Sequence, residues 1–177
     1  FGGNLQNPTE RIARLHIPKV GCKMVQADQV GAEAFIVSKL CPPDCNLRAI
    51  FDCGIKIHSF VAMHIFRKQI EAMWGRSLRE FIEAPVRELK KHSDYKALFQ
   101  LIKDTDTLAV KLRYYFIAKQ VCHSSNYGAG AGAVITNTLQ KSNGAVVLGQ
   151  KETEMFLDIL HNQLFPEICE VFHKGVQ

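Results

Sequence analysis

The sequence predicts a mainly α-helical protein: a single-core bundle of about seven or eight helices with one small β-hairpin near the C-terminus. Two observations support this fold class. Helix start and stop signals recur along the first two thirds of the chain, and apolar residues spaced three and four apart lie between them. The Asn143-Gly144 pair then separates two short runs rich in β-branched residues, which is the usual signal of a hairpin.

The helices of the first part of the chain are predicted mostly from their ends. Pro8 follows Asn7 and occupies the favoured first position of a helix, and Pro42 stops a helix that Asp28 begins. Pro85 ends one helix and starts another, while Gly75 is a natural C-terminal stop. The expected helices cover residues 8–16, 28–40, 58–74, 78–84, 86–92, 94–103 and 105–116.

These signals divide the chain into five segments. We expect a flexible tail at residues 1–7 and a helical core at 8–123, followed by a mobile loop at 124–133, where the sequence is rich in Gly and Ala. The β-hairpin is predicted at 134–149. A C-terminal helix at 150–177 is expected to pack on the core.

The predicted hairpin needs a surface to pack against, because two strands alone are marginally stable in water. Its apolar side chains are Val134, Ile135, Val146 and Val147. We expect them to contact either the core or a second chain, since an open strand edge pairs readily with another strand. Self-association into a homo-oligomer is therefore one expectation.

Composition predicts an ordinary globular chain. Of its 177 residues 47% are hydrophobic and 22% are charged, and the longest apolar runs fall far short of the roughly 18 residues that cross a bilayer. No membrane association is expected. Six cysteines are too few for a disulfide scaffold in a chain of this length, so we expect reduced thiols and a cytoplasmic or nuclear location. The net charge of +5 permits an acidic partner without requiring one.

A candidate zinc site consists of Cys41, Cys45, Cys53 and His58. Thiolates and imidazole are the ligands that zinc prefers, and four of them close a tetrahedral site. The last part of this spacing, C-x3-C-x7-C-x4-H, resembles that of CCCH zinc fingers and departs from it at the first and last gaps. The alternative is a metal-free segment in which Pro42-Pro43 ends one helix and Asp44 or Asn46 caps the next. The sequence favours this alternative, with no cofactor, because residues 47–51 have the spacing of a core-facing helix.

A candidate RNA-binding patch lies between residues 76 and 113. Tyr95 precedes Lys96, and an aromatic side chain beside a cation suits single-stranded nucleic acid. Arg87 and Lys91 are four residues apart and should share a helix face. The full candidate set is Arg76, Arg79, Arg87, Lys90, Lys91, Tyr95, Lys96 and Arg113.

Other polar groups give no clear catalytic pattern. Residues 128–133 contain a G-x-G-x-x-A spacing, but a helix is expected before it and a strand after it, the reverse of a dinucleotide site. Cys122 and His123 are adjacent, so their side chains are expected to point apart. Asp158 and His161 are expected on a solvated helix face.

The sequence therefore predicts a non-enzymatic helical interaction domain that binds a protein partner and self-associates. One alternative is a helical RNA-binding or nucleocapsid-type domain with a basic surface. The other is an enzyme whose site residues meet only in the folded chain.

Overall fold

The structure is a computed structural model that describes residues 19–23, 31–107 and 113–175. The chain divides into two units, residues 1–30 and 31–177. In the first unit, the described residues form a turn in which the Cys22 N–H donates a hydrogen bond to the Lys19 carbonyl. The predicted tail at 1–7 and helix at 8–16 lie outside the described residues.

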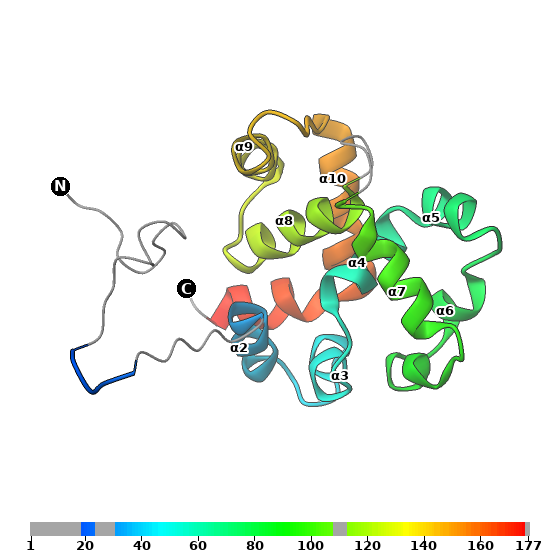
Figure 1. Ribbon diagram of the computed structural model, residues 1–177, viewed down its shortest axis with the longest axis horizontal. Coiled ribbons are helices and arrows are strands. Elements are labelled where there is room, and N and C mark those ends of the chain that lie inside the picture. Colours follow the sequence, from blue (N-terminus) through cyan, green and yellow to red (C-terminus); the bar gives the residue numbers. More distant parts are fainter. Residues whose placement is uncertain (1–18, 24–30, 108–112, 176–177) are drawn as a thin grey trace. The chain divides into compact units, whose positions relative to one another are not determined.

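The second unit consists of short helices joined by tight connections (Figure 1). Its first half contains α2 (Ala32–Leu40), α3 (Asn46–Asp52), α4 (Ile57–Ile65), α5 (Arg67–Trp74), α6 (Arg79–Glu83) and the 3₁₀-helix η1 (Val86–Lys91). Its second half contains α7 (Tyr95–Asp104), α8 (Tyr114–Asn126), α9 (Ala131–Lys141), α10 (Gln150–Asp158) and the π-helices η2 (Ile159–Leu164) and η3 (Ile168–His173). The prediction of a mainly helical fold is confirmed.

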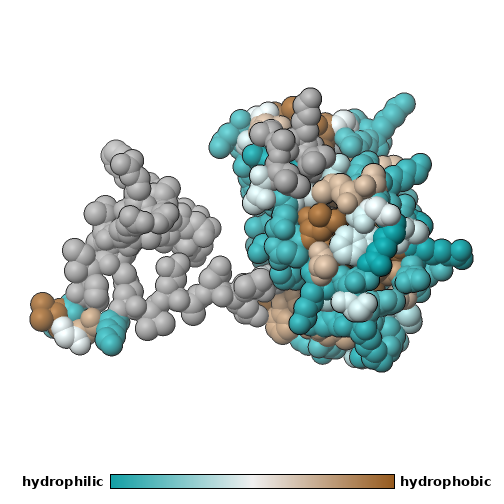
Figure 2. All heavy atoms as spheres, turned by 45° about the vertical axis from the view of Figure 1, so that its right-hand side comes forward, coloured by the Kyte–Doolittle hydropathy of each residue, from teal (hydrophilic) through white to brown (hydrophobic). Residues whose placement is uncertain are grey.

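α4 lies at the centre of this unit, where it packs on α5, α7, α8 and η2 (Figure 1). Val61, Ala62 and Met63 are fully buried in it. Because neighbours cover α4 on several sides, its sequence is apolar around most of the helix rather than along one stripe. The surrounding helices contribute their apolar faces to the same core. On the outer side of α5 and α6, hydrophilic residues cover most of the surface (Figure 2).

The helix predicted at 58–74 is interrupted at Phe66, where the backbone leaves helical geometry (φ −107°, ψ 32°) and separates α4 from α5. The buried Phe66 ring stacks on Tyr114 at a centroid distance of 4.5 Å and lies edge-to-face with the Phe156 ring at 5.2 Å. Trp74 at the end of α5 is half-buried, with the Arg76 guanidinium 4.8 Å above its ring.

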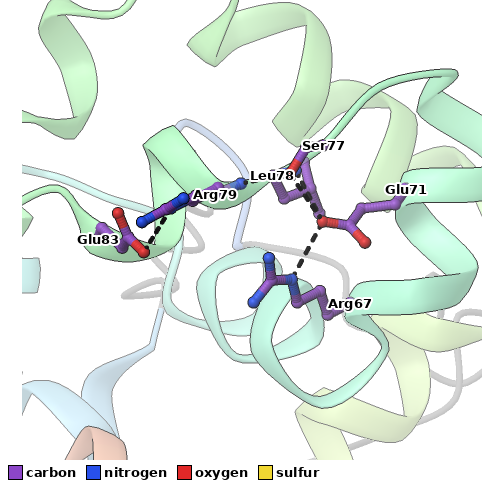
Figure 3. A network of polar contacts seen from close by, with 6 residues as sticks. All are labelled: Arg67, Glu71, Ser77, Leu78, Arg79 and Glu83. Atoms are coloured by element: carbon purple, nitrogen blue, oxygen red, sulfur yellow. Dashed lines mark hydrogen bonds and ion pairs between the residues drawn. The ribbon is translucent and has the colours of Figure 1, made fainter.

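Glu71 holds the corner between α5 and α6 (Figure 3). Its Oε1 atom accepts hydrogen bonds from the Leu78 N–H at 2.9 Å, the Arg67 Nε–H at 3.0 Å and the Ser77 hydroxyl at 3.3 Å. The Leu78 amide, followed by Arg67, holds the pKa of the Glu71 carboxyl below its usual range. Residues 77–80 have the pattern of a capping box, yet a glutamate from the preceding helix satisfies the amide at this corner.

The predicted hairpin at 134–149 is wrong, because the described residues form no β-strand there or elsewhere. The predicted loop at 124–133 is largely helical: α8 continues to Asn126 and α9 begins at Ala131. Asn143 and Gly144 do adopt the positive φ angles that a hairpin turn requires, 52° and 79°. They terminate α9 instead, and the Gly144 N–H donates to the Leu139 carbonyl at 2.8 Å.

Tertiary packing explains why residues 134–138 are helical despite their β-branched side chains. Val134 and Thr138 are four residues apart and both fully buried, as expected on one face of a helix that packs on α8 and α10. The preference of β-branched residues for strands depends strongly on packing, and the burial of Val134 and Thr138 in the helix outweighs it. Residues 145–149 then lead to α10 without a strand partner among the described residues.

Where α8 packs on α9, the core contains buried polar atoms without hydrogen bonds, which lower the stability of the fold. Gln120, Ser124 and Thr138 are each less than 5% exposed, and in the described part of the chain the Gln120 Oε1, Ser124 Oγ and Thr138 Oγ1 atoms have no hydrogen-bond partner. An unpaired buried polar group costs about 1–3 kcal/mol.

Replacing Thr138 by Val is therefore expected to stabilise the protein by about 1 kcal/mol, because Val has the same shape and no hydroxyl to desolvate. Chemical denaturation of the two proteins measures this difference. Thr136→Val on the same helix is the matched control: Thr136 is exposed and donates to the Gly132 carbonyl, so its effect should stay within about 0.5 kcal/mol. Destabilisation by Thr138→Val would contradict the prediction.

Candidate functional site: a groove between α2, α8 and η3

A groove of about 660 Å³ lies between α2, the C-terminal end of α8 and η3. Its volume falls within the range of about 300–1,000 Å³ that is typical of binding clefts. The groove is positioned by the contacts of α2 with both α8 and η3. Its walls include Glu33, Ile36, Val37, Tyr127, Phe172 and His173.

The α2 wall is apolar on a face that the core does not use. Ala34 and Val37 are buried, whereas Ile36 and Leu40 are each 58% exposed. Ile36 and Leu40 are four residues apart, so their side chains lie one turn apart on the same side of α2. Tyr127, at the opposite wall, is 67% exposed. Exposed apolar side chains gathered along a cleft are typical of a binding surface, in contrast to single ones scattered over a surface.

Glu33 gives the groove a negative charge beside this apolar wall. Its Oε1 atom accepts a hydrogen bond from the Tyr127 hydroxyl at 2.7 Å, and its Oε2 atom lies 2.6 Å from Nδ1 of His123. The bond to Glu33 raises the pKa of the Tyr127 hydroxyl. The carbonyl end of α8 lies at the same place, and the helix dipole there adds partial negative charge. A cation at this end of the groove therefore has to share or replace the contact of His123 with Glu33.

Ser125 joins three elements directly behind the groove. Its hydroxyl lies 2.6 Å from Nε2 of His161 in η2, and its carbonyl accepts a hydrogen bond from Nε2–H of His173 in η3 at 2.9 Å. A serine beside a histidine is also the arrangement of a nucleophile and its base. Ser125 is fully buried, however, so its hydroxyl is closed to a substrate. The expectation that His161 lies on a solvated face is wrong, since it is half-buried at this junction.

Two of the candidate zinc ligands instead pack around Glu167. The Cys41 thiol donates to the Glu167 carbonyl at 3.8 Å, and Cys45 is the N-cap of α3, where its sulfur accepts from the Arg48 N–H at 3.4 Å. Burial raises the pKa of Cys41 to about 11 and also raises the pKa of Cys45. Because zinc binds thiolates, a thiol with a raised pKa must release its proton first, so this burial opposes metal binding. The cap is Cys45 itself rather than the expected Asp44 or Asn46.

The other two candidate zinc ligands lie elsewhere. Cys53 follows the last turn of α3, and an α-helix rises about 1.5 Å per residue, so it lies about 12 Å along the axis from Cys45. His58 is in α4, with Nδ1 3.5 Å from the Tyr115 hydroxyl, and burial, Lys119 and His123 lower its pKa to about 4. The structure does not bring the four residues together. Within the described ranges, no three His, Cys, Asp or Glu residues form a group suited to a metal ion.

Carboxylates pair with several residues of the candidate RNA-binding patch. Arg76 pairs with Asp94, Arg79 with Glu83 at 2.8 Å (Figure 3), and Lys91 with Glu88 at 2.5 Å. Lys91 faces Glu88 because η1 is a 3₁₀-helix, in which residues three apart share a face. The shared face predicted for Arg87 and Lys91 assumed an α-helix. Arg87, Lys90 and Lys96 are exposed.

The aromatic part of that patch is not available for base stacking. Tyr95 is 9% exposed, and its ring lies 4.2 Å from that of Phe99 in the core. Arg113 is half-buried, with its guanidinium 6.0 Å from the Phe116 ring. The structure therefore does not bring the eight residues into one stacking surface.

The four predicted interface residues were expected to contact either the core or a second chain, and three of them, Val134, Ile135 and Val146, contact the core. Val134 and Val146 are buried at 0% and 7% exposure, and Ile135 is half-buried against the core. Val147 is exposed. The four residues therefore do not form one outward-facing surface.

Sequence reasoning missed the groove, although one signal was present. α2 carries apolar residues on two faces, Ala34 and Val37 on one and Ile36 and Leu40 on the other. A short helix that is apolar on two faces either has neighbours on both or presents one face to a ligand. The positions of Tyr127 and Phe172 beside it had no local signal.

No protein-family model, curated protein or solved structure matches this chain. Among the helices that the structure describes, none is long and apolar enough to span a membrane.

Proposed function

We propose that this chain is a non-enzymatic interaction domain that binds an amphipathic helix of a protein partner in the groove between α2, α8 and η3. The observation that carries the proposal is the exposed apolar side chain of Ile36 in the α2 wall of the groove, with the exposed Leu40 one turn further along the helix. Amphipathic helices bind such grooves through apolar side chains spaced three, four and seven residues apart. α2 is about 13 Å long, which matches two to three turns of a partner helix.

The charge at the groove supports a particular kind of partner helix. Glu33 and the carbonyl end of α8 are complementary to a Lys or Arg side chain beside the partner's apolar face. The proposed ligand is therefore a basic amphipathic helix rather than an acidic one. The whole chain is basic, with a net charge of +5, so long-range repulsion opposes such a partner and the local carboxylate must provide the specificity.

Selection from a displayed library of helical peptides tests the proposal. The library carries fixed apolar anchors and varies one flanking position among Lys, Gln and Glu. Peptides with Lys should be enriched. Because burying an isoleucine contributes about 1.5–3 kcal/mol, the selected peptides should bind Ile36→Asp at least tenfold more weakly than the unchanged protein.

Leu139→Asp is the matched control, since Leu139 is an exposed apolar residue of α9 that does not line the groove. Its affinity for the peptides should stay within about twofold. Circular dichroism of both variants checks that the helices remain folded. If no peptide is enriched, or if Ile36→Asp binds as well as Leu139→Asp, the groove is not the binding site.

A further inference from the structure

The η3 wall of the groove is held in place by histidines. His173 is a wall residue and donates to the Ser125 carbonyl, while the Ser125 hydroxyl bonds to His161. We call these two hydrogen bonds the Ser125 junction. It connects η3 to the end of α8 and to η2, so the position of the Phe172–His173 wall depends on it. The two histidine rings are 6.3 Å apart in an edge-to-face arrangement.

We propose that the Ser125 junction is a pH-sensitive contact that holds the η3 wall of the groove in place at neutral pH and releases it in mildly acidic solution. The inference rests on the proposed function for its use in controlling a partner. Its physical basis, a change in the order of η3, is independent of any partner.

The positions of the hydrogen atoms at the Ser125 junction explain why a fall in pH, rather than a rise, releases η3. A carbonyl only accepts, so His173 carries its hydrogen on Nε2. The Ser125 hydroxyl hydrogen is satisfied when neutral His161 accepts it at Nε2 and carries its own hydrogen on Nδ1. Protonation of His161 puts a hydrogen on Nε2 as well, and that N–H now donates to Ser125 Oγ. The Ser125 hydrogen then has no acceptor among the described residues, in a fully buried position.

The surroundings of the junction also favour the neutral form of His161. Burial and then His173 lower the pKa of His161, while Asp158 one turn earlier partly offsets them. On the neighbouring elements, Glu33 of α2 is occupied by His123 of α8, and His58 of α4 lies near that same histidine. The charged residues that flank His173 in sequence on η3 are Glu170 and Lys174.

The lowered pKa of His161 determines whether the protein loses stability in acidic or in basic solution. A histidine whose pKa is lower in the folded chain stabilises the fold fully above the unfolded value, about 6.5. This contribution is lost as the pH falls below that value. Burial also lowers the pKa values of His58 and His64 in α4, so the same sign applies there. η3 should nevertheless loosen first, because several of its residues are at least partly exposed whereas neighbouring helices cover α4 on several sides.

Hydrogen exchange of the whole chain, read by mass spectrometry at pH 7.5 and pH 5.5 and corrected for the intrinsic rate at each pH, tests the inference. The expected result is at least a tenfold rise in exchange for peptides covering 168–173 at pH 5.5, with α4 unchanged. His161→Gln, whose amide oxygen still accepts from Ser125 but takes up no proton, should keep exchange within about twofold between the two pH values. His92→Gln, which alters a half-buried histidine outside the groove, should respond as the unchanged protein does.

Histidine ring signals in the nuclear magnetic resonance spectrum give a second measurement on the unchanged chain, in case His161→Gln folds poorly. The His161 ring should titrate together with the backbone signals of η3. Exchange in 168–173 that is equal at both pH values, or an equal rise in His161→Gln, would overturn the inference. If exchange responds as expected but no helical peptide binds, the proposed function fails and the pH response stands. If peptides bind with equal affinity at both pH values, the pH response fails and the groove stands.

Discussion

Replacing Phe156 by Ala should lower the free energy of unfolding by about 3–5 kcal/mol. Phe156 is 1% exposed in α10, and its ring and the Phe66 ring lie in an edge-to-face arrangement at a centroid distance of 5.2 Å. Phe66 also separates α4 from α5, and Tyr114 stacks on its ring. Loss of the Phe156 ring therefore opens a cavity at the meeting point of α4, α8 and α10. Since domains of this kind are stable by roughly 5–15 kcal/mol in total, the variant should be close to unfolding at body temperature.

The adjacent residue provides the control. Met155 is 50% exposed on the outer side of α10, so Met155→Ala should change the free energy of unfolding by less than about 1 kcal/mol. Urea denaturation followed by circular dichroism measures both variants. Similar losses for the two variants would mean that α10 does not pack on the core through Phe156.

Replacing Glu167 by Ala is expected to cost about 2 kcal/mol. Glu167 is a buried acid, 7% exposed, and its Oε1 atom accepts a hydrogen bond from the Leu47 N–H at 2.8 Å in the first turn of α3. After burial, the Glu167 carboxylate also contributes to the raised pKa of the Cys45 thiol. Removal of the carboxylate leaves a buried amide without an acceptor and removes a negative charge from the start of a helix.

Two further variants separate these contributions. Glu167→Gln keeps an oxygen acceptor without the charge, so its loss of stability should be about half that of Glu167→Ala. Glu170→Ala removes an exposed acid from the same part of the chain and should have an effect below about 0.5 kcal/mol. Thermal unfolding of the three variants measures the order of their stabilities. A Glu167→Ala variant as stable as Glu170→Ala would show that the contact with α3 does not contribute to the fold.

The contacts with Glu167 also explain why the spacing of Cys41 and Cys45 in the sequence suggests a metal site that the structure does not assemble. Cys41 and Cys45 are close in the chain and look like two ligands of one site. In the folded protein their partner is a C-terminal glutamate more than a hundred residues away, and burial raises the pKa of both thiols. Spacing within a short segment could not reveal this, because the decisive neighbour is distant in sequence.

Local signals were sufficient for much of the helical fold. Pro42 follows the end of α2 and Gly75 ends α5 with a φ of 77°, both as expected from general helix-end chemistry. These features depend on the backbone of a few adjacent residues. The same reasoning identified positive φ at Asn143 and Gly144.

The sequence by itself therefore determined the helix ends at Pro42 and Gly75 and the turn at Asn143-Gly144, because steric limits on Pro, Gly and Asn act locally. Only the tertiary structure decided that the turn at Asn143-Gly144 ends a helix, since burial of Val134 and Thr138 outweighs their preference for strands. The groove and the Ser125 junction were likewise decided by tertiary structure. Glu33, Ser125, His161 and His173 lie in separate parts of the chain, and only the packing of α2, α8, η2 and η3 brings them together.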